Sequence, residues 1–377
     1  MIHNLNRNLS RMQPSGIRRF TALARSTPGC SMLTIGEPDF DTPMSIRESA
    51  MRALEEGVTH YPPNNGDTAL RAAISEFERK HNGLSYQPDE IIITNGANEA
   101  LYLALGGILN PGDEVIIPTP AFSLYESIVL MFGGVPVFLD TTETDFQIDP
   151  ERLRARITPR TKALVLNSPN NPSGVVLTDE CLNGIHDAVA PYPVYIVCDE
   201  VYNRLLYTGA RSFASYADLR DRILIAQSFS KPYAMTGWRV GYLMADAALI
   251  PPLAMMHAAT VSCISSFSQK ACIDALQVDV GDMLSTYRER RDFICARLSK
   301  MGLTFPQPQG AFYVFPSIEK YGMDAEEFCI RMIEKGGVAG VPGTCFRTPG
   351  YLRFSYCYAL PQIEEAMDKL EAYLQTL

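Results

Sequence analysis

The sequence predicts an α/β fold in which a mostly parallel central sheet is sandwiched by helices and a smaller α+β domain follows. From residue 90 to residue 241, short apolar runs alternate with helical patterns, which favours this class. Hydrophobic residues form 46% and charged residues 20% of the 377 residues, which is typical of a globular protein with a large core. Rigid polar turns follow several of the apolar runs, at the sheet edge where such folds bind ligands.

The overall composition argues against several classes of protein. The net charge of −9 is unsuited to nucleic acid, and no apolar run approaches the ~18 residues of a membrane span. Met1–Asn4 begins no signal peptide, because no apolar segment follows it. The nine cysteines form no C-x-x-C pair and most are interpreted as buried thiols, which favours a reducing cytoplasm. Dinucleotide and Walker motifs and metal-ligand clusters are absent, and the five dispersed histidines are given no role.

The elements expected along the chain divide it into three parts. We expect 1–42 to form an N-terminal arm and part of a small domain, 43–278 the large domain and 279–377 the small C-terminal domain. Helices are predicted from Ser15, from Pro43 to about Gly57, through Leu70, Ile74 and Phe77, after Val261–Ser266, and through Tyr287 and Phe293. Strands are predicted at 32–35, 91–94, 115–118, 135–138, 163–166, 193–198, 223–226, 310–315 and 351–355.

The stretch 228–241 organises the rest of the chain. Lys231 is expected on a loop that leaves the buried strand 223–226, because Pro232 and Gly237 interrupt regular structure. Arg239, eight positions later, is expected on a second buried strand, where it would demand an anionic partner. A lysine, two serine hydroxyls and an arginine together indicate an aldehyde held as a Schiff base beside a phosphate.

Other chemistry-bearing residues follow predicted strands. Asp199 comes directly after the strand 193–198, where an open sheet binds ligands, although helix capping is an alternative role. The turn 95–98 precedes a helix whose free N–H groups can hold a phosphate. Two prolines and a glycine stiffen the loop 167–174. Arg353 lies in an apolar strand and needs an anion, either a ligand or an internal salt-bridge partner.

These motifs resemble, in a fixed order, the class I/II aminotransferases, the pyridoxal-phosphate enzymes of the aspartate aminotransferase fold (fold type I). The resemblance runs from about Ser15 to the C-terminus and looks closest to bacterial aromatic and N-acetyl-diaminopimelate aminotransferases. Its motifs are Gly36–Phe40 (GEPDF), Gly96–Leu101 (GAxxAL), Asn171–Gly174 (NPSG), the lysine stretch 228–241 and Gly310–Tyr313 (GAFY).

The resemblance implies a role for each candidate residue. Lys231 would hold pyridoxal 5′-phosphate as an aldimine and move the proton, with Asp199 pairing to the pyridine nitrogen and Tyr202 completing the catalytic set. Phe122 would stack on the ring, and Asn171 and Tyr202 would bind its phenolic oxygen. The remaining cofactor contacts would be Ala97, Asn98, Ser228, Ser230, Arg239 and, from the neighbouring subunit of a homodimer, Tyr61. The substrate would be held by Gly36, Asn171, Arg353 and Ile17.

The function implied is the transfer of the amino group of an L-amino acid to a 2-oxo acid by a ping-pong mechanism. A C–S β-lyase on the same fold is the alternative, since the same residues would serve it. A cofactor-sensing regulator would need a DNA-binding region, and the forty residues before Asp41 are too few for one. Some members that use acidic substrates carry a lysine where Asn98 and Glu99 stand, which makes aspartate a less expected substrate. The short loop Gly343–Gly350 puts lid-like contacts in doubt.

Overall fold

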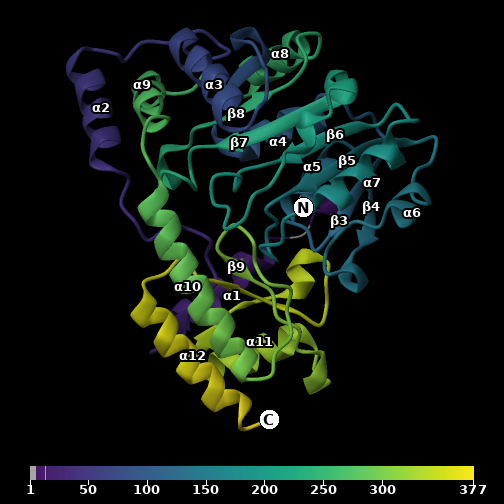
Figure 1. Ribbon diagram of the computed structural model, residues 1–377, viewed down its shortest axis with the longest axis vertical. Coiled ribbons are helices and arrows are strands. Elements are labelled where there is room, and N and C mark those ends of the chain that lie inside the picture. The colour runs from purple at the N-terminus through teal and green to yellow at the C-terminus, as the bar shows by residue number, and fades with distance from the viewer. Residues whose placement is uncertain (1–5, 13) are drawn as a thin grey trace, which may run out of the picture.

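A computed structural model of the protein describes residues 6–12 and 14–377. Its largest feature is a seven-stranded sheet in the upper part of Figure 1, while α1, α11 and α12 lie in the lower part and α10 connects the two. The strands, in chain order, are β2 (Ile91–Thr94), β3 (Glu114–Thr119), β4 (Val135–Asp140), β5 (Thr161–Asn167), β6 (Tyr195–Asp199), β7 (Ile223–Ser228) and β8 (Gly241–Met244).

The order of the strands in this sheet is β2-β8-β7-β6-β5-β3-β4. All neighbours are parallel except that β8 runs antiparallel to both β2 and β7. The predicted mostly parallel sheet is therefore confirmed. Because β8 is reversed, its first residue, Gly241, lies beside the last residues of its neighbours, Thr94 and Ser228.

Alternate residues of each strand enter two different hydrophobic clusters, because successive side chains point to opposite faces. Ile91 and Ile93 pack into one cluster, and Ile92 into the other. The first face is covered by α2 (Met44–Glu55), α3 (Thr68–His81), α7 (Asp179–Val189) and α9 (Ser266–Ala275). The second is covered by α4 (Gly96–Gly106), α5 (Leu124–Met131) and α8 (Ile250–Val261), so helices sandwich the sheet. A short helix, α6 (Pro150–Arg154), packs on α7.

A third cluster joins the two ends of the chain. It combines Phe20 and Leu33 with residues from 202 to 373, which supports placing part of 1–42 in the small domain. The domain boundaries themselves stay a prediction. The elements here are α1 (Gly16–Ser26), α10 (Gly281–Lys300), α11 (Ala325–Glu334), α12 (Leu360–Leu374), the pair β1 (Ser31–Met32) and β10 (Val338–Ala339), and the antiparallel sheet of β11 (Val341–Pro342), β12 (Leu352–Ser355) and β9 (Tyr313–Val314).

Several predicted elements differ in extent. The strands expected at 32–35 and 310–315 are two residues long, and Pro43 caps α2 from outside the helix. All nine cysteines are free thiols, six of them buried, as their apolar surroundings predicted. Within 6–12 and 14–377, we find no helix that combines the length and the apolar character needed to cross a membrane. The expectation for Met1–Asn4 concerns residues outside those described.

Candidate active site

A cavity of about 500 Å³ opens at the edge of the sheet where the parallel strands end. The last residues of β5, β6 and β7, Asn167, Asp199 and Ser228, all line it. Tyr313 and Arg353, from the C-terminal part of the chain, also line the cavity. Of the residues predicted for the site, the lining includes Ile17, Gly36, Ala97, Asn98, Phe122, Asn171, Asp199, Tyr202, Ser228, Ser230, Lys231, Arg239 and Arg353. The structure thus brings together thirteen of the fourteen predicted residues.

Lys231 lies in the turn that directly follows β7, as predicted. Its Nζ donates a hydrogen bond of 2.6 Å to the carbonyl oxygen of Gly36 and lies 5.9 Å from the ring centre of Phe312. Burial disfavours the charged ammonium and lowers the pKa of Lys231 to about 8. With this pKa, roughly a tenth of the amine is neutral at pH 7, and the neutral form can act as a nucleophile and a proton acceptor.

Asp199 is 4% exposed and is held by Tyr125, whose hydroxyl donates to Oδ2 at 2.5 Å. Burial raises the pKa of Asp199 to about 6, and the bond from Tyr125 opposes that rise. No described helix begins at Asp199, so the alternative of helix capping is wrong. The carboxylate is instead a buried acceptor aimed at the cavity. It is the only carboxylate among the described residues of the lining.

Two tyrosines meet beside Gly36. The hydroxyls of Tyr202 and Tyr313 are 2.8 Å apart, and burial raises the pKa of Tyr202. A Cβ on Gly36 would collide with the Tyr313 hydroxyl, so this position requires glycine. The Gly36 main chain can therefore approach both Lys231 and the tyrosine pair closely.

The start of α4 also lines the cavity, and this helix begins at Gly96 rather than after the expected turn 95–98. Ala97 and Asn98 thus lie in its first turn, where N–H groups are free to bind an anion. Gly96 has φ +69°, and a Cβ there would overlap the guanidinium of Arg239. That close approach forms a cradle between a cation and a helix start.

The prediction that Arg239 is buried on a strand is wrong. The chain makes a 3-10 turn at Thr236–Trp238, and Arg239 adopts a left-handed conformation with φ +55° before β8 begins. Its side chain is exposed and donates to the carbonyl oxygens of Thr236 (3.1 Å) and Asn95 (3.3 Å). Because both acceptors are neutral carbonyl oxygens, the positive charge of Arg239 is not compensated by them and can bind an anion. Because of the turn that contains Gly237, Arg239 lines the cavity and does not belong to the sheet.

Arg353, on β12, is 2% exposed and forms no ion pair with any residue that the structure describes. It donates through Nη1 to Asn171 Oδ1 at 2.9 Å and through Nη2 to Thr34 O at 2.5 Å. The rings of Tyr313 and Phe346 flank the guanidinium at 4.7 and 4.9 Å, and its buried Nε has no acceptor. The internal salt bridge is therefore not observed. A buried cation with an unused donor fits a carboxylate ligand.

Tyr61 is the predicted residue that does not line this cavity. It is 91% exposed and borders a separate open hollow of about 680 Å³ with residues 263–267. Phe122 does line the active-site cavity, although it precedes α5 by two residues instead of starting it.

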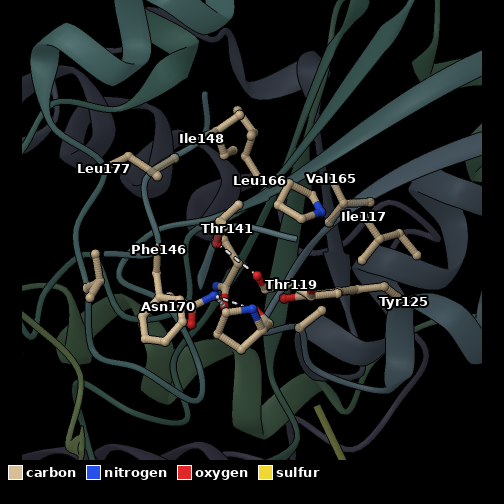
Figure 2. A pocket seen from close by; sticks show the side chains of 15 residues that line it. Ile117, Thr119, Tyr125, Thr141, Phe146, Ile148, Val165, Leu166, Asn170 and Leu177 are labelled. Atoms are coloured by element: carbon tan, nitrogen blue, oxygen red, sulfur yellow. Dashed lines mark hydrogen bonds between the residues drawn. The ribbon is translucent and has the colours of Figure 1, made fainter. Parts of the chain in front are cut away.

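Tyr125 and Tyr313 are site residues that sequence reasoning missed. Tyr125, Thr119 and Asn170 also line a second cavity (Figure 2), whose volume of about 30 Å³ gives room for about one or two waters. Tyr125 lines both this cavity and the larger one, so it forms a wall between them. Its position three residues after Phe122 could have indicated a shared helix face. Tyr313 closes the GAFY segment but had no role assigned.

The fold and the site together define an α/β protein whose cavity combines a partly neutral lysine with two arginines, Arg239 and Arg353. The chain belongs to the aminotransferase class I and II family, whose model matches residues 29–370. It is 39% identical over 381 residues to a probable N-acetyl-LL-diaminopimelate aminotransferase of Bacillus subtilis, covering 99% of this chain and 96% of that protein. An aromatic-amino-acid aminotransferase 2 of Thermococcus litoralis is also 39% identical, covering 98% of both chains.

The fold agrees with these relatives. The aspartate aminotransferase from Thermus thermophilus, solved with maleate, superimposes with a TM-score of 0.94 at 37% identity, covering 99% of this chain and all of that one. The predicted aspartate aminotransferase fold is confirmed. The chain is an aminotransferase, so the predicted transfer of an amino group is confirmed as its activity.

Proposed function

We propose that this aminotransferase works with pyridoxal phosphate in the 500 Å³ cavity, moving an amino group from an L-amino acid to a 2-oxo acid by a ping-pong mechanism. One observation carries the proposal. Lys231 lies in a cavity whose lining also includes Arg239 and Arg353, with Asp199 as its only described carboxylate. A phosphate and a carboxylate are the anions that such arginines bind best.

The residues present fit the cofactor. The cradle between Gly96 and Arg239 suits a phosphate, because a side chain at Gly96 would fill it. Asp199 would hold a proton on the ring nitrogen, and Phe122 would cover the ring face. The other phosphate contacts would be Ala97, Asn98, Ser228 and Ser230, and the phenolic oxygen would lie with Asn171 and Tyr202. When bound, pyridoxal phosphate withdraws electrons from the substrate α-carbon.

The chain's own residues would then transfer one proton and bind the α-carboxylate of the substrate. Lys231 would hold the cofactor, and as a free amine it would take the proton from the substrate Cα and deliver it to the carbon of the cofactor's aldehyde group, which is the proton shift that transamination requires. Its pKa of about 8 suits both tasks near neutral pH. Arg353 and the Gly36 main chain would fix the α-carboxylate, and Ile17 would contact the substrate beside them. Fixing the carboxylate sets the orientation of the Cα–H bond toward Lys231.

We further infer that the working unit is a homodimer. Tyr61 is exposed and lies outside the cavity of its own chain, which is the arrangement expected of a residue that serves the partner's phosphate. The large open hollow that it borders offers a surface for a second copy. The free thiols are consistent with a cytoplasmic enzyme.

Reduction of the holoenzyme with borohydride, followed by peptide mapping, tests the proposal. The pyridoxyl label is expected on Lys231, and Lys231→Ala should bind the phosphate cofactor but lose turnover. A label on another lysine refutes the assignment.

A further inference from the structure

The charges around the cavity contain one cation that the proposed function does not use. Among the residues that the structure describes, four cationic side chains line the cavity: Arg18, Lys231, Arg239 and Arg353. Lys231 is assigned to the cofactor, Arg239 to its phosphate and Arg353 to the α-carboxylate of the substrate. Asp199 faces the ring nitrogen. Arg18 is left without a partner from the cofactor or from an amino acid with a single carboxylate.

Arg18 lines the cavity next to a residue that packs near Arg353. It is the third residue of α1, and the preceding Ile17 packs against the cluster that contains Phe346. The Phe346 ring in turn lies 4.9 Å from the guanidinium of Arg353. Arg239, in contrast, lies against Gly96 at the start of α4. A group bound by Arg18 would therefore belong to the substrate side chain and not to the cofactor phosphate.

The side chain of Arg18 is also free to bind. It is exposed, and it forms no hydrogen bond or ion pair with the residues in 6–12 and 14–377. The next residue, Arg19, differs in both respects that matter: it lies outside the cavity lining, and its Nη1 pairs with Glu326 at 2.8 Å. Two adjacent arginines thus have different surroundings, and only Arg18 offers its planar fork to the cavity.

We propose that Arg18 is a specificity-determining residue that binds the second carboxylate of a dicarboxylic substrate, on either the amino acid or the 2-oxo acid side. This inference rests on the proposed function, because it takes the other three cations as occupied. A substrate with two carboxylates matches two arginines that line the same cavity and are not taken by the cofactor, and the guanidinium fork suits the planar carboxylate. The absence of a lysine at Asn98 therefore does not argue against acidic substrates, since Arg18 supplies a cation from another element.

The test compares 2-oxoglutarate with 2-oxopentanoate, which has the same chain length but a methyl group in place of the second carboxylate. Arg18→Gln should lower kcat/KM for 2-oxoglutarate about ten- to hundredfold and for 2-oxopentanoate much less. Arg18→Lys should restore part of the loss. Arg19→Gln, the matched control, removes the same charge from the same helix and should show no difference between the two acids. Calorimetric binding of glutarate and pentanoate to the holoenzyme should show the same contrast without turnover.

Equal losses for both acids, or no loss for either, would overturn the inference, as would a loss in Arg19→Gln matching that in Arg18→Gln. A loss confined to aromatic substrates would also overturn it, because it would indicate stacking on the guanidinium. If the pyridoxyl label falls on Lys231 and the wild-type enzyme turns over, these outcomes refute only the role of Arg18. If the label falls elsewhere, the proposed function fails first.

Discussion

Replacing Arg353 by lysine should lower kcat/KM for L-amino acids about thirty- to thousandfold. Lysine keeps the charge but loses the two parallel hydrogen bonds that a guanidinium can donate to a carboxylate. Charge-assisted bonds contribute about 1.5–3 kcal/mol each, and the retained charge offsets part of that, which leaves a loss of roughly 2–4 kcal/mol. At ~1.4 kcal/mol per factor of ten, this is the stated range.

The empty enzyme should also lose stability, since Arg353 already donates to Asn171 Oδ1 and Thr34 O between two aromatic rings. We expect a cost of about 1–3 kcal/mol from these bonds. A lowered Tm therefore does not separate a carboxylate-binding arginine from a structural one. The sequence alone shows neither of these two acceptors.

The discriminating assay compares each amino acid with the amine that lacks its α-carboxylate. The loss should be large for the amino acid and small for the amine. Arg290→Lys is the matched control, because Arg290 is also buried but pairs with Asp39 at 2.7 and 2.9 Å outside the cavity lining. It should lower Tm without distinguishing the two substrates. Equal losses for amino acid and amine in Arg353→Lys would refute the reasoning.

Three further predictions follow from named contacts. Gly96→Ala places a Cβ on the Arg239 guanidinium at φ +69° and should weaken equilibrium binding of pyridoxal phosphate at least about tenfold; an unchanged Kd contradicts the cradle. Asp199→Asn should abolish activity yet stabilise the empty protein above pH 6 by up to about 3 kcal/mol, since burial raises the pKa from 3.8 to about 6. The gain should vanish below about pH 4, where both side chains are neutral, and an unfolding series across pH measures it. Mixing Tyr61→Phe chains with Lys231→Ala chains should restore activity through hybrid dimers, and a fully active monomer in sedimentation excludes the shared site.

The sequence predicted the sheet and most of the cavity because the relevant signals are local. Asp199 and Lys231 each follow a continuous apolar strand, and strand ends meet at one edge in a parallel sheet. The features that the sequence did not predict depend on the backbone conformation of a single turn or on contacts between residues far apart in the sequence. Arg239 sits in a left-handed conformation that its apolar neighbours do not reveal. The bonds from Tyr125 to Asp199 and from Tyr313 to Tyr202 join segments 74 and 111 residues apart, which no local pattern indicates.

The reversed direction of β8 has a consequence for how the enzyme can change in evolution. Four of the connections between consecutive strands of the sheet contain an α-helix (α4, α5, α6 and α7), whereas 229–240 returns from β7 to the adjacent β8 without one, and Ser228 and Gly241 are paired in register. The two ends of this segment are thus fixed, and Lys231 and Arg239 share it. An inserted or deleted residue between them would leave the strands paired but change the distance between the lysine and the arginine. Selection should therefore tolerate length changes in the exposed loops elsewhere and reject them between 231 and 239.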